Sequence, residues 1–182
     1  ADLHAHLFRV TLSIDQPALQ QRVSLPAWIP GSYLVREFSK NLQRLAARQE
    51  ARAVAVQQLD KCNWQIECVP SSPLVLSYDV YAFDNSVRTA WLDSQRGFFN
   101  GTSLCLRVHG QEAAPHALEL VADKAIAHWE AACALPVLKA GRRGFGSYLA
   151  NHYDELVDSP PRFETEILGA ADERRSRQAI RF

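Results

Sequence analysis

The fold is decided by the stretch His4-Ala5-His6-Leu7-Phe8-Arg9-Val10-Thr11-Leu12-Ser13-Ile14. Apolar or ring-bearing side chains occupy every second position, and mostly polar or small side chains lie between them. An alternation with a period of two residues is typical of a β-strand that buries one face and exposes the other. We therefore predict one long strand over residues 4–14.

Further strands are predicted at short intervals along the chain. Segments rich in β-branched and aromatic residues are separated by turn-forming runs such as Asp84-Asn85-Ser86 and Asp93-Ser94-Gln95-Arg96-Gly97. The predicted strands cover residues 23–25, 35–48, 53–56, 64–68, 74–83, 87–92, 102–108 and 117–121, although 35–48 also fits a helical stripe. This order predicts a mainly β fold, an antiparallel β-sandwich or a saddle-shaped sheet. Little helix is expected near the C-terminal end, where the Ala-rich residues 125–134 are the candidate.

Composition excludes several classes of protein. The 182 residues suit one domain with a single core. Lys plus Arg and Asp plus Glu both number 20, so no global field attracts nucleic acid or anionic lipid. The apolar runs are far shorter than the roughly 18 residues of a membrane span. We therefore expect no nucleic-acid partner and no membrane partner.

The cysteines indicate a reducing compartment. Cys62 and Cys68 lie in a strand-like segment that would hold their α-carbons about 20 Å apart, too far for a disulfide. Cys105 and Cys133 are isolated in the sequence, and no Cys-x-x-Cys pair occurs. We expect free thiols and a cytoplasmic protein. A periplasmic location stays open as the alternative, because the sequence starts at Ala1 without methionine, which indicates a trimmed or truncated N-terminus.

Residues that could carry catalysis do not form a complete set. His4 and His6 would share one face of a strand, but no third ligand is evident and no His-Glu-x-x-His motif occurs. Asp154, Glu155 and Asp158 form an acidic cluster, and an independent hydrolase built on it would need these carboxylates to line a pocket. A solvated surface is the simpler interpretation. We assign no catalytic and no metal-binding residue to this chain.

The most suggestive local motif is Arg96-Gly97-Phe98-Phe99-Asn100-Gly101-Thr102. Asn-Gly is the usual sequence of a tight hairpin turn, so a purely conformational role is one interpretation. The other is that exposed backbone amides and the Asn100 side chain grip the end of a peptide.

Four longer strings are spread over residues 25–160. They are Leu25-Pro26-Ala27-Trp28-Ile29-Pro30-Gly31-Ser32-Tyr33-Leu34-Val35-Arg36-Glu37-Phe38, Tyr81-Ala82-Phe83-Asp84-Asn85-Ser86-Val87-Arg88, Gly97-Phe98-Phe99-Asn100-Gly101-Thr102-Ser103-Leu104 and Tyr153-Asp154-Glu155-Leu156-Val157-Asp158-Ser159-Pro160. In order and spacing they resemble the glycyl aminopeptidase family, metallopeptidase family 61. Its members combine an N-terminal β domain, a thermolysin-like zinc catalytic domain and usually a C-terminal PDZ domain.

The resemblance implies that this chain is the first of those domains. Residues 1–160 would form the N-terminal β domain, and residues 161–182 would be the start of the missing catalytic domain or a disordered tail. The family usually continues after the fourth string with a small or apolar residue, Glu and Gly, whereas this chain reads Pro161-Arg162-Phe163-Glu164.

The resemblance also implies a function. The complete enzyme would be a zinc-dependent aminopeptidase, a metalloprotease that hydrolyses peptides at small N-terminal residues. The fragment alone is expected to be inactive and to hold no cofactor, with zinc bound in the catalytic domain. Its expected partners are that catalytic domain and the peptide substrate. Phe98, Asn100 and Thr102 are the candidates for substrate-binding residues in one wall of the cleft.

An alternative is a stand-alone β-sandwich module that binds peptide or carbohydrate. Trp28, Tyr33 and Trp91 would then be its stacking platforms. An exposed coplanar row of these rings would favour that interpretation.

Overall fold

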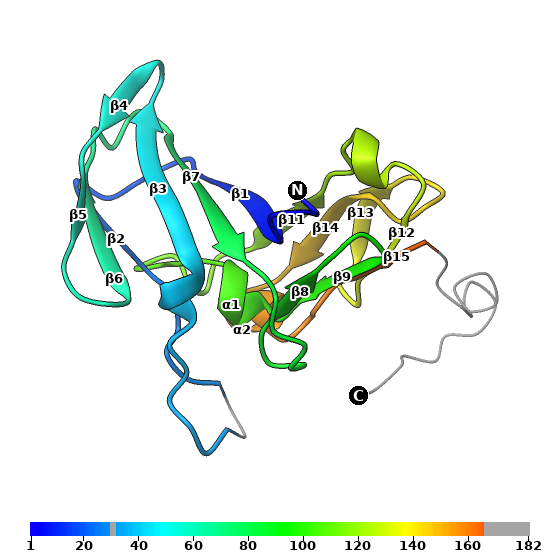
Figure 1. Ribbon diagram of the computed structural model, residues 1–182. Helices are drawn as coiled ribbons and strands as arrows, with labels where there is room; N and C mark the ends of the chain where they lie inside the picture. The colour runs from blue at the N-terminus through cyan, green and yellow to red at the C-terminus, as the bar shows by residue number, and fades with distance from the viewer. Residues whose placement is uncertain (30–31, 166–182) are drawn as a thin grey trace.

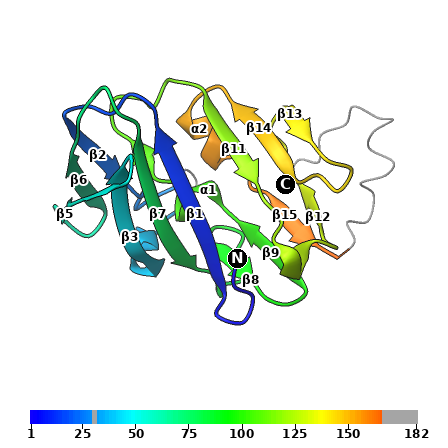
Figure 2. The same cartoon turned by 90° about the horizontal axis from the view of Figure 1, so that it is seen from above.

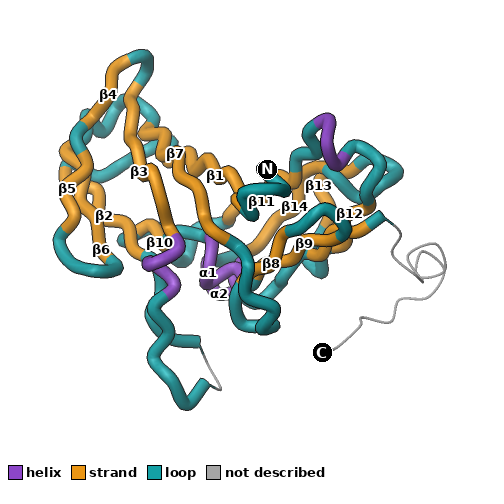
Figure 3. Tube along the Cα trace, in the orientation of Figure 1, coloured by secondary structure: helices purple, strands orange, loops and turns teal. Residues whose placement is uncertain are grey.

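The computed structural model describes residues 1–29 and 32–165, which are mostly β-strands joined by turns (Figures 1 and 3). The strands are β1 Leu7–Ile14, β2 Gln20–Ser24, β3 Leu42–Gln49, β4 Arg52–Val54, β5 Val56–Gln58, β6 Asn63–Glu67, β7 Leu74–Tyr81, β8 Ala90–Leu92, β9 Arg96–Phe99, β10 Arg107–Val108, β11 His116–Leu120, β12 Glu130–Ala132, β13 Val137–Ala140, β14 Gly146–Ala150 and β15 Arg162–Glu164. The helices are α1 Gly101–Leu104 and α2 Tyr153–Val157, with 3₁₀ turns η1 Phe38–Asn41 and η2 Lys124–Ile126.

In the part of the chain that is described, the strands form four sheets and every strand pairing is antiparallel. The strand orders are β1-β7-β3-β4, β10-β2-β6-β5, β11-β14-β13 and β12-β15-β9-β8. The prediction of a mainly β, antiparallel fold with little helix is confirmed.

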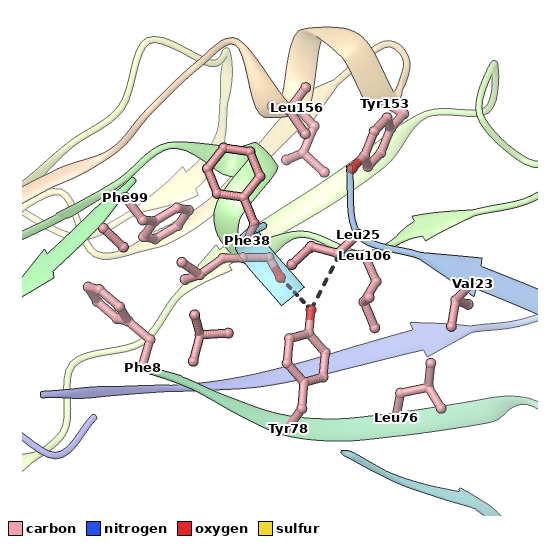
Figure 4. Packing of buried hydrophobic residues seen from close by; sticks show 14 of the residues in the cluster. Phe8, Val23, Leu25, Phe38, Leu76, Tyr78, Phe99, Leu106, Tyr153 and Leu156 are labelled. Carbon is pink, nitrogen blue, oxygen red and sulfur yellow. Dashed lines mark hydrogen bonds between the residues drawn. The ribbon is translucent and has the colours of Figure 1, made fainter. Parts of the chain in front are cut away.

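The first two sheets lie face to face and form a sandwich (Figure 1). Along β7 the side chains of Leu74, Leu76, Tyr78 and Val80 are buried, and the residues between them are more exposed. Leu76 lies close to Val23 of the opposing sheet in Figure 4. The period-two pattern therefore places its apolar face in the core, as expected.

The other two sheets share that core. All four sheets contribute buried side chains to one hydrophobic cluster. In β15, Phe163 is buried with its ring centroid 6.2 Å from Phe8 and 6.1 Å from Phe99. β15 pairs with both β9 and β12, so the β core continues through Glu164.

Tyr78 joins the sandwich to the helical region. Its buried hydroxyl donates to the Leu104 carbonyl at 2.7 Å and accepts from the Leu106 amide at 3.4 Å (Figure 4). The Leu104 carbonyl lies at the C-terminal end of α1, the Leu106 amide lies between α1 and β10, and neither belongs to a strand. A side chain thus satisfies buried backbone groups that no neighbouring strand pairs.

The predicted strand over 4–14 is too long at its start. β1 begins at Leu7, and the preceding residues form a turn in which His6 has a φ of 55°. Asp2 and Leu7 exchange backbone hydrogen bonds, and Asp2 Oδ1 accepts from the Ala5 amide. These contacts reverse the chain, so His4 and His6 do not lie on one strand face.

Three other local predictions are corrected. Residues 35–48 include the 3₁₀ turn η1 before β3 begins, and residues 125–134 contain η2 and β12 instead of a short α-helix. The predicted strand over 102–108 is helix α1 followed by the short β10. Gly101 does not have the positive φ of a hairpin turn.

The four cysteines are free, as predicted. Among the residues that are described, no helix has the length and apolar character needed to cross a bilayer.

Candidate functional site

Asn100 starts helix α1 instead of a hairpin turn. Its backbone is extended, and its Oδ1 accepts hydrogen bonds from the Thr102 amide at 3.1 Å and the Thr102 hydroxyl at 2.5 Å. A side-chain oxygen that accepts from the amide two residues later is the usual N-cap of a helix. Asn100 and Thr102 are therefore brought together, but their polar atoms bond to one another.

Gly101 is required at the start of this helix by close packing. A Cβ at position 101 would lie 2.5 Å from Val157 Cα and 3.1 Å from the Leu156 carbonyl oxygen. Both of those atoms belong to α2. Asn100 thus caps helix α1, and Gly101 allows α2 to pack closely against it. The glycine is needed here because a Cβ would overlap the backbone of α2, and not because the backbone needs a positive φ.

Hydrogen bonds to Thr89 fix α1 against the turn before β8. The Asn100 amide donates to the Thr89 carbonyl at 2.8 Å, and Ser103 Oγ donates to the same oxygen at 3.2 Å. Thr89 Oγ1 in turn donates to the carbonyls of Asp84 and Ser86. The segment 84–89 and helix α1 therefore form one connected unit.

Phe98 lies on the outer face of the sheet β12-β15-β9-β8. It is half-buried, whereas its neighbours Gly97 and Phe99 are buried on the inner face. Trp91 stands directly opposite it on β8, and Arg162 stands opposite it on β15. Phe98 is thus the one predicted site residue whose side chain is not used in capping or burial.

An aromatic stack adjoins Phe98. Phe83 stacks on Trp91 with ring centroids 4.4 Å apart and an interplanar angle of 19°, and the His6 ring lies 4.0 Å from Phe83. The Phe83 side chain is 46% exposed, so the stack reaches solvent. We call His6, Phe83 and Trp91 the aromatic stack.

Two charged side chains, Arg96 and Asp93, contact Trp91 of the aromatic stack. The Arg96 guanidinium carbon lies 5.7 Å from the centroid of the Trp91 ring, and Trp91 Nε1 donates to Asp93 Oδ2 at 2.9 Å. Burial raises the pKa of Asp93, but hydrogen bonds from Arg96, Gln95 and Trp91 outweigh it, and the net pKa is lowered. Asp93 therefore stays ionised at neutral pH and orients the indole.

A second exposed feature is the loop between β2 and η1, which projects away from the sheets (Figure 1). Four large apolar side chains on it are exposed: Trp28 by 53%, Tyr33 by 104%, Leu34 by 63% and Val35 by 75%. We call these four residues the apolar loop. Trp28 Nε1 donates to the Ser32 carbonyl at 2.8 Å, which holds the indole against the loop backbone.

The stacking row of the alternative hypothesis is not formed. Trp91 stacks on Phe83 and carries Arg96, while Trp28 and Tyr33 lie on the apolar loop. In the described part of the chain, no ring contact joins Trp28, Tyr33 and Trp91.

The remaining candidate chemistry is weak. No cluster of three His, Cys, Asp or Glu side chains suited to a metal occurs among residues 1–29 and 32–165. Asp154 and Asp158 are exposed, and Glu155 Oε2 accepts from the Asn151 amide. None of the three lines the cavity of about 1200 Å³ that the described residues form beside β1 and β11. Burial raises the pKa of Cys105 to about 12, so its thiol is a poor nucleophile.

Comparison with known proteins agrees with this architecture. The family model of the peptidase M61 N-terminal domain matches residues 1–162. The chain belongs to the peptidase M61 N-terminal domain family. It is also similar to the crystal structure of an aminopeptidase N family protein from Idiomarina loihiensis, with 42% sequence identity and a TM-score of 0.86.

That similarity covers 90% of this chain and 28% of the Idiomarina chain, so this M61 domain corresponds to little more than a quarter of that protein. No curated protein sequence matches the chain significantly.

The aromatic stack was not predicted as a unit from the sequence. Phe83 and Trp91 flank the turn 84–90, and an isolated antiparallel bridge joins them. Two aromatic residues on either side of a turn were the available signal, because such residues meet when the strands pair. His6 carried no such signal, since it reaches the stack only after the turn before β1 reverses the chain.

Proposed function

We propose that this chain is the non-catalytic N-terminal domain of a zinc-dependent aminopeptidase and forms one wall of its substrate cleft. The observation that carries the proposal is the apolar loop, whose four large side chains project into solvent. Several large apolar side chains exposed together on one loop usually mark a contact with another protein surface. In the complete enzyme the apolar loop packs against the catalytic domain.

The zinc belongs to the catalytic domain. The described residues of this chain do not assemble a set of ligands for it. When bound there, zinc would polarise the scissile carbonyl and activate water. The contribution of this domain is to bind and orient the peptide.

Phe98 is the residue best placed for that contribution. Its half-exposed ring lies beside the aromatic stack and offers an apolar surface to a small N-terminal residue or to the peptide backbone. Asn100 Oδ1 is engaged by Thr102, and its Nδ2 makes no hydrogen bond within the described residues. Phe98 provides contact area, Asn100 Nδ2 donates a hydrogen bond to the peptide, and Thr102 fixes the orientation of the Asn100 side chain.

Two experiments test the proposal. The isolated chain, assayed with zinc and Gly- or Ala-aminoacyl substrates, is expected to show no turnover, and robust metal-dependent turnover would overturn the non-catalytic role. Hydrogen exchange over residues 32–37 is expected to be slower in the complete enzyme than in the isolated chain. Equal exchange in both would show that the apolar loop is not covered.

The wall itself is tested by Phe98→Ala in the complete enzyme. The Michaelis constant should rise about fivefold, which corresponds to a loss of about 1 kcal/mol in binding free energy when one contact side chain is truncated. Val137→Ala is the matched control, because Val137 is 61% exposed on a different sheet. An unchanged Michaelis constant for Phe98→Ala would remove this residue from the cleft. We propose a cytoplasmic location on the basis of the free thiols.

A further inference from the structure

Two sheet edges face one another across a groove in this domain. β1 is the edge strand of the sheet β1-β7-β3-β4, and β11 is the edge strand of β11-β14-β13. Figures 1 and 2 both place the two strands side by side. Among the pairings of the described strands none joins β1 to β11, and a cavity of about 1200 Å³ is lined by residues 8–16 and 114–121 of these two segments.

The floor of the groove is hydrophobic core. On β1 the side chains of Val10 and Leu12 are only partly buried and pack against the core, and on β11 Leu118 does the same. The intervening residues, such as Thr11 and Glu119, are exposed. Both strands therefore direct apolar side chains into the same layer, which is left incompletely covered between them.

A buried polar atom also lacks a partner at this place. Trp129 is fully buried and lines the groove, and its Nε1 has no hydrogen-bond acceptor among the described residues. An unpaired N–H in the interior costs about 1–3 kcal/mol. The unpaired N–H shows that the lining of the groove is not fully satisfied by the described residues.

The N-terminus enters the groove in a defined register. Leu7 pairs with Tyr81 of β7 on one side, so its hydrogen bonds with Asp2, at 2.8 and 2.9 Å, lie on the other side, which faces the groove. Ala1 lines the groove. Because the Asp2–Leu7 bridge is antiparallel, a chain followed backwards from Ala1 would run along the free edge of β1.

We propose that the groove takes one extended polypeptide strand with alternating apolar residues, supplied in the same chain from the N-terminal side of Ala1. It continues the Asp2–Leu7 ladder antiparallel to β1 and pairs on its other edge with β11. About six residues before Ala1 reach the partner of Ile14 in this one-to-one register. Two sheets are thereby joined into one, with both free edges covered.

The register determines which positions of the added strand face the core, because directly opposed residues share a face of the sheet. Ala1 opposes Phe8 and so points inward, and the positions opposite Val10, Leu12 and Ile14 must be apolar. The test variant adds Val-Thr-Val-Thr-Val-Thr directly before Ala1. The control adds Thr-Val-Thr-Val-Thr-Val, which has the same composition and length but turns the apolar side chains to solvent.

Amide hydrogen exchange and thermal unfolding are measured on the unextended chain and both extended chains. The in-phase extension is expected to slow exchange in both β1 and β11 by about tenfold or more and to raise the Tm, with the β5–β6 hairpin as internal reference. The control extension should do neither.

Three outcomes would overturn the proposal. Protection of β1 without β11 would mean a hairpin that does not enter the groove. Equal protection by both extensions would mean that binding in the groove does not depend on which positions of the strand are apolar. Protection of the unextended chain by the free hexapeptide at equal strength, or by raising the protein concentration, would assign the groove to a separate peptide or to a second copy.

Discussion

The contact between α1 and α2 makes a sharp prediction for Gly101→Ala. The added methyl carbon would lie 2.5 Å from Val157 Cα, whereas carbon atoms in contact are normally about 3.5–4.0 Å apart. The nearest atoms are backbone, so no rotation of a side chain relieves the overlap. The two short helices must separate by about 1 Å, or Asn100 must give up its capping geometry.

The magnitude follows from two opposed effects. Overpacking of this kind costs about 1–3 kcal/mol. The gain in helix propensity from Gly to Ala is at most about 1 kcal/mol in a helix interior, and it is smaller at the first position of a four-residue helix. We expect a net loss of about 1–2 kcal/mol, which for a chain of this size lowers the Tm by about 2–8 °C.

Thermal unfolding followed by circular dichroism measures this loss. The matched control is Gly141→Ala, because a Cβ there would meet only the Phe145 carbonyl oxygen, at 3.6 Å, and the residue does not have a positive φ. The control should unfold within about 2 °C of the parent. If Gly101→Ala is as stable as Gly141→Ala, the packing argument for the Asn-Gly sequence is refuted.

Four further predictions concern single residues. Asn100→Ala should lower stability by about 1 kcal/mol through loss of the cap, while Asn100→Asp should restore most of it in thermal unfolding. Tyr78→Phe should cost about 1–3 kcal/mol in urea unfolding, because two buried backbone groups lose their partner. Burial lowers the pKa of His109, so the unfolded state binds more protons just below pH 6.5, and stability should fall as the pH drops through this range but stay flatter in His109→Gln. Burial raises the pKa of Cys105 to about 12, and its native thiol should react with a disulfide reagent at least about tenfold more slowly than in urea, with Cys62→Ser as the comparison that removes the Cys62 thiol from the reaction.

Strand content was predictable because it depends on neighbours in the sequence. The alternation that continues from Leu7 to Ile14 and along β7 is visible in the residue order, and in the structure the same alternation separates buried from exposed side chains. Free thiols were predictable for a related reason, since an extended segment holds Cys62 and Cys68 apart whatever surrounds it.

The two main local errors have different causes. Asn100-Gly101 has the composition of a hairpin turn, but α2 packs so closely on position 101 that a helix without a Cβ forms there. His4 and His6 continue the alternation of β1, but the bridge between Asp2 and Leu7 turns the chain before it can become a strand. At Asn100-Gly101 a contact between separate segments overrides the local preference, whereas at His4 and His6 a hydrogen-bonded turn within residues 2–7 does so.

The candidate site was predictable only in part. The sequence singled out the string that contains Phe98, and whether Phe98, Asn100 and Thr102 bind a peptide stays a prediction. That Phe98 faces outward beside Trp91, and that Asn100 and Thr102 bond to one another, depends on how β8, β9 and α1 meet.

By itself the sequence determined that this chain is a mainly β, antiparallel domain with free thiols, and its four strings pointed to the M61 family, because strand periodicity and motif spacing are properties of residue order. Only the tertiary structure decided which strands pair, which edges of β1 and β11 remain open, and which side chains of the apolar loop and the aromatic stack reach solvent. These features depend on contacts between residues far apart in the chain, and a local sequence pattern does not determine the geometry of such contacts.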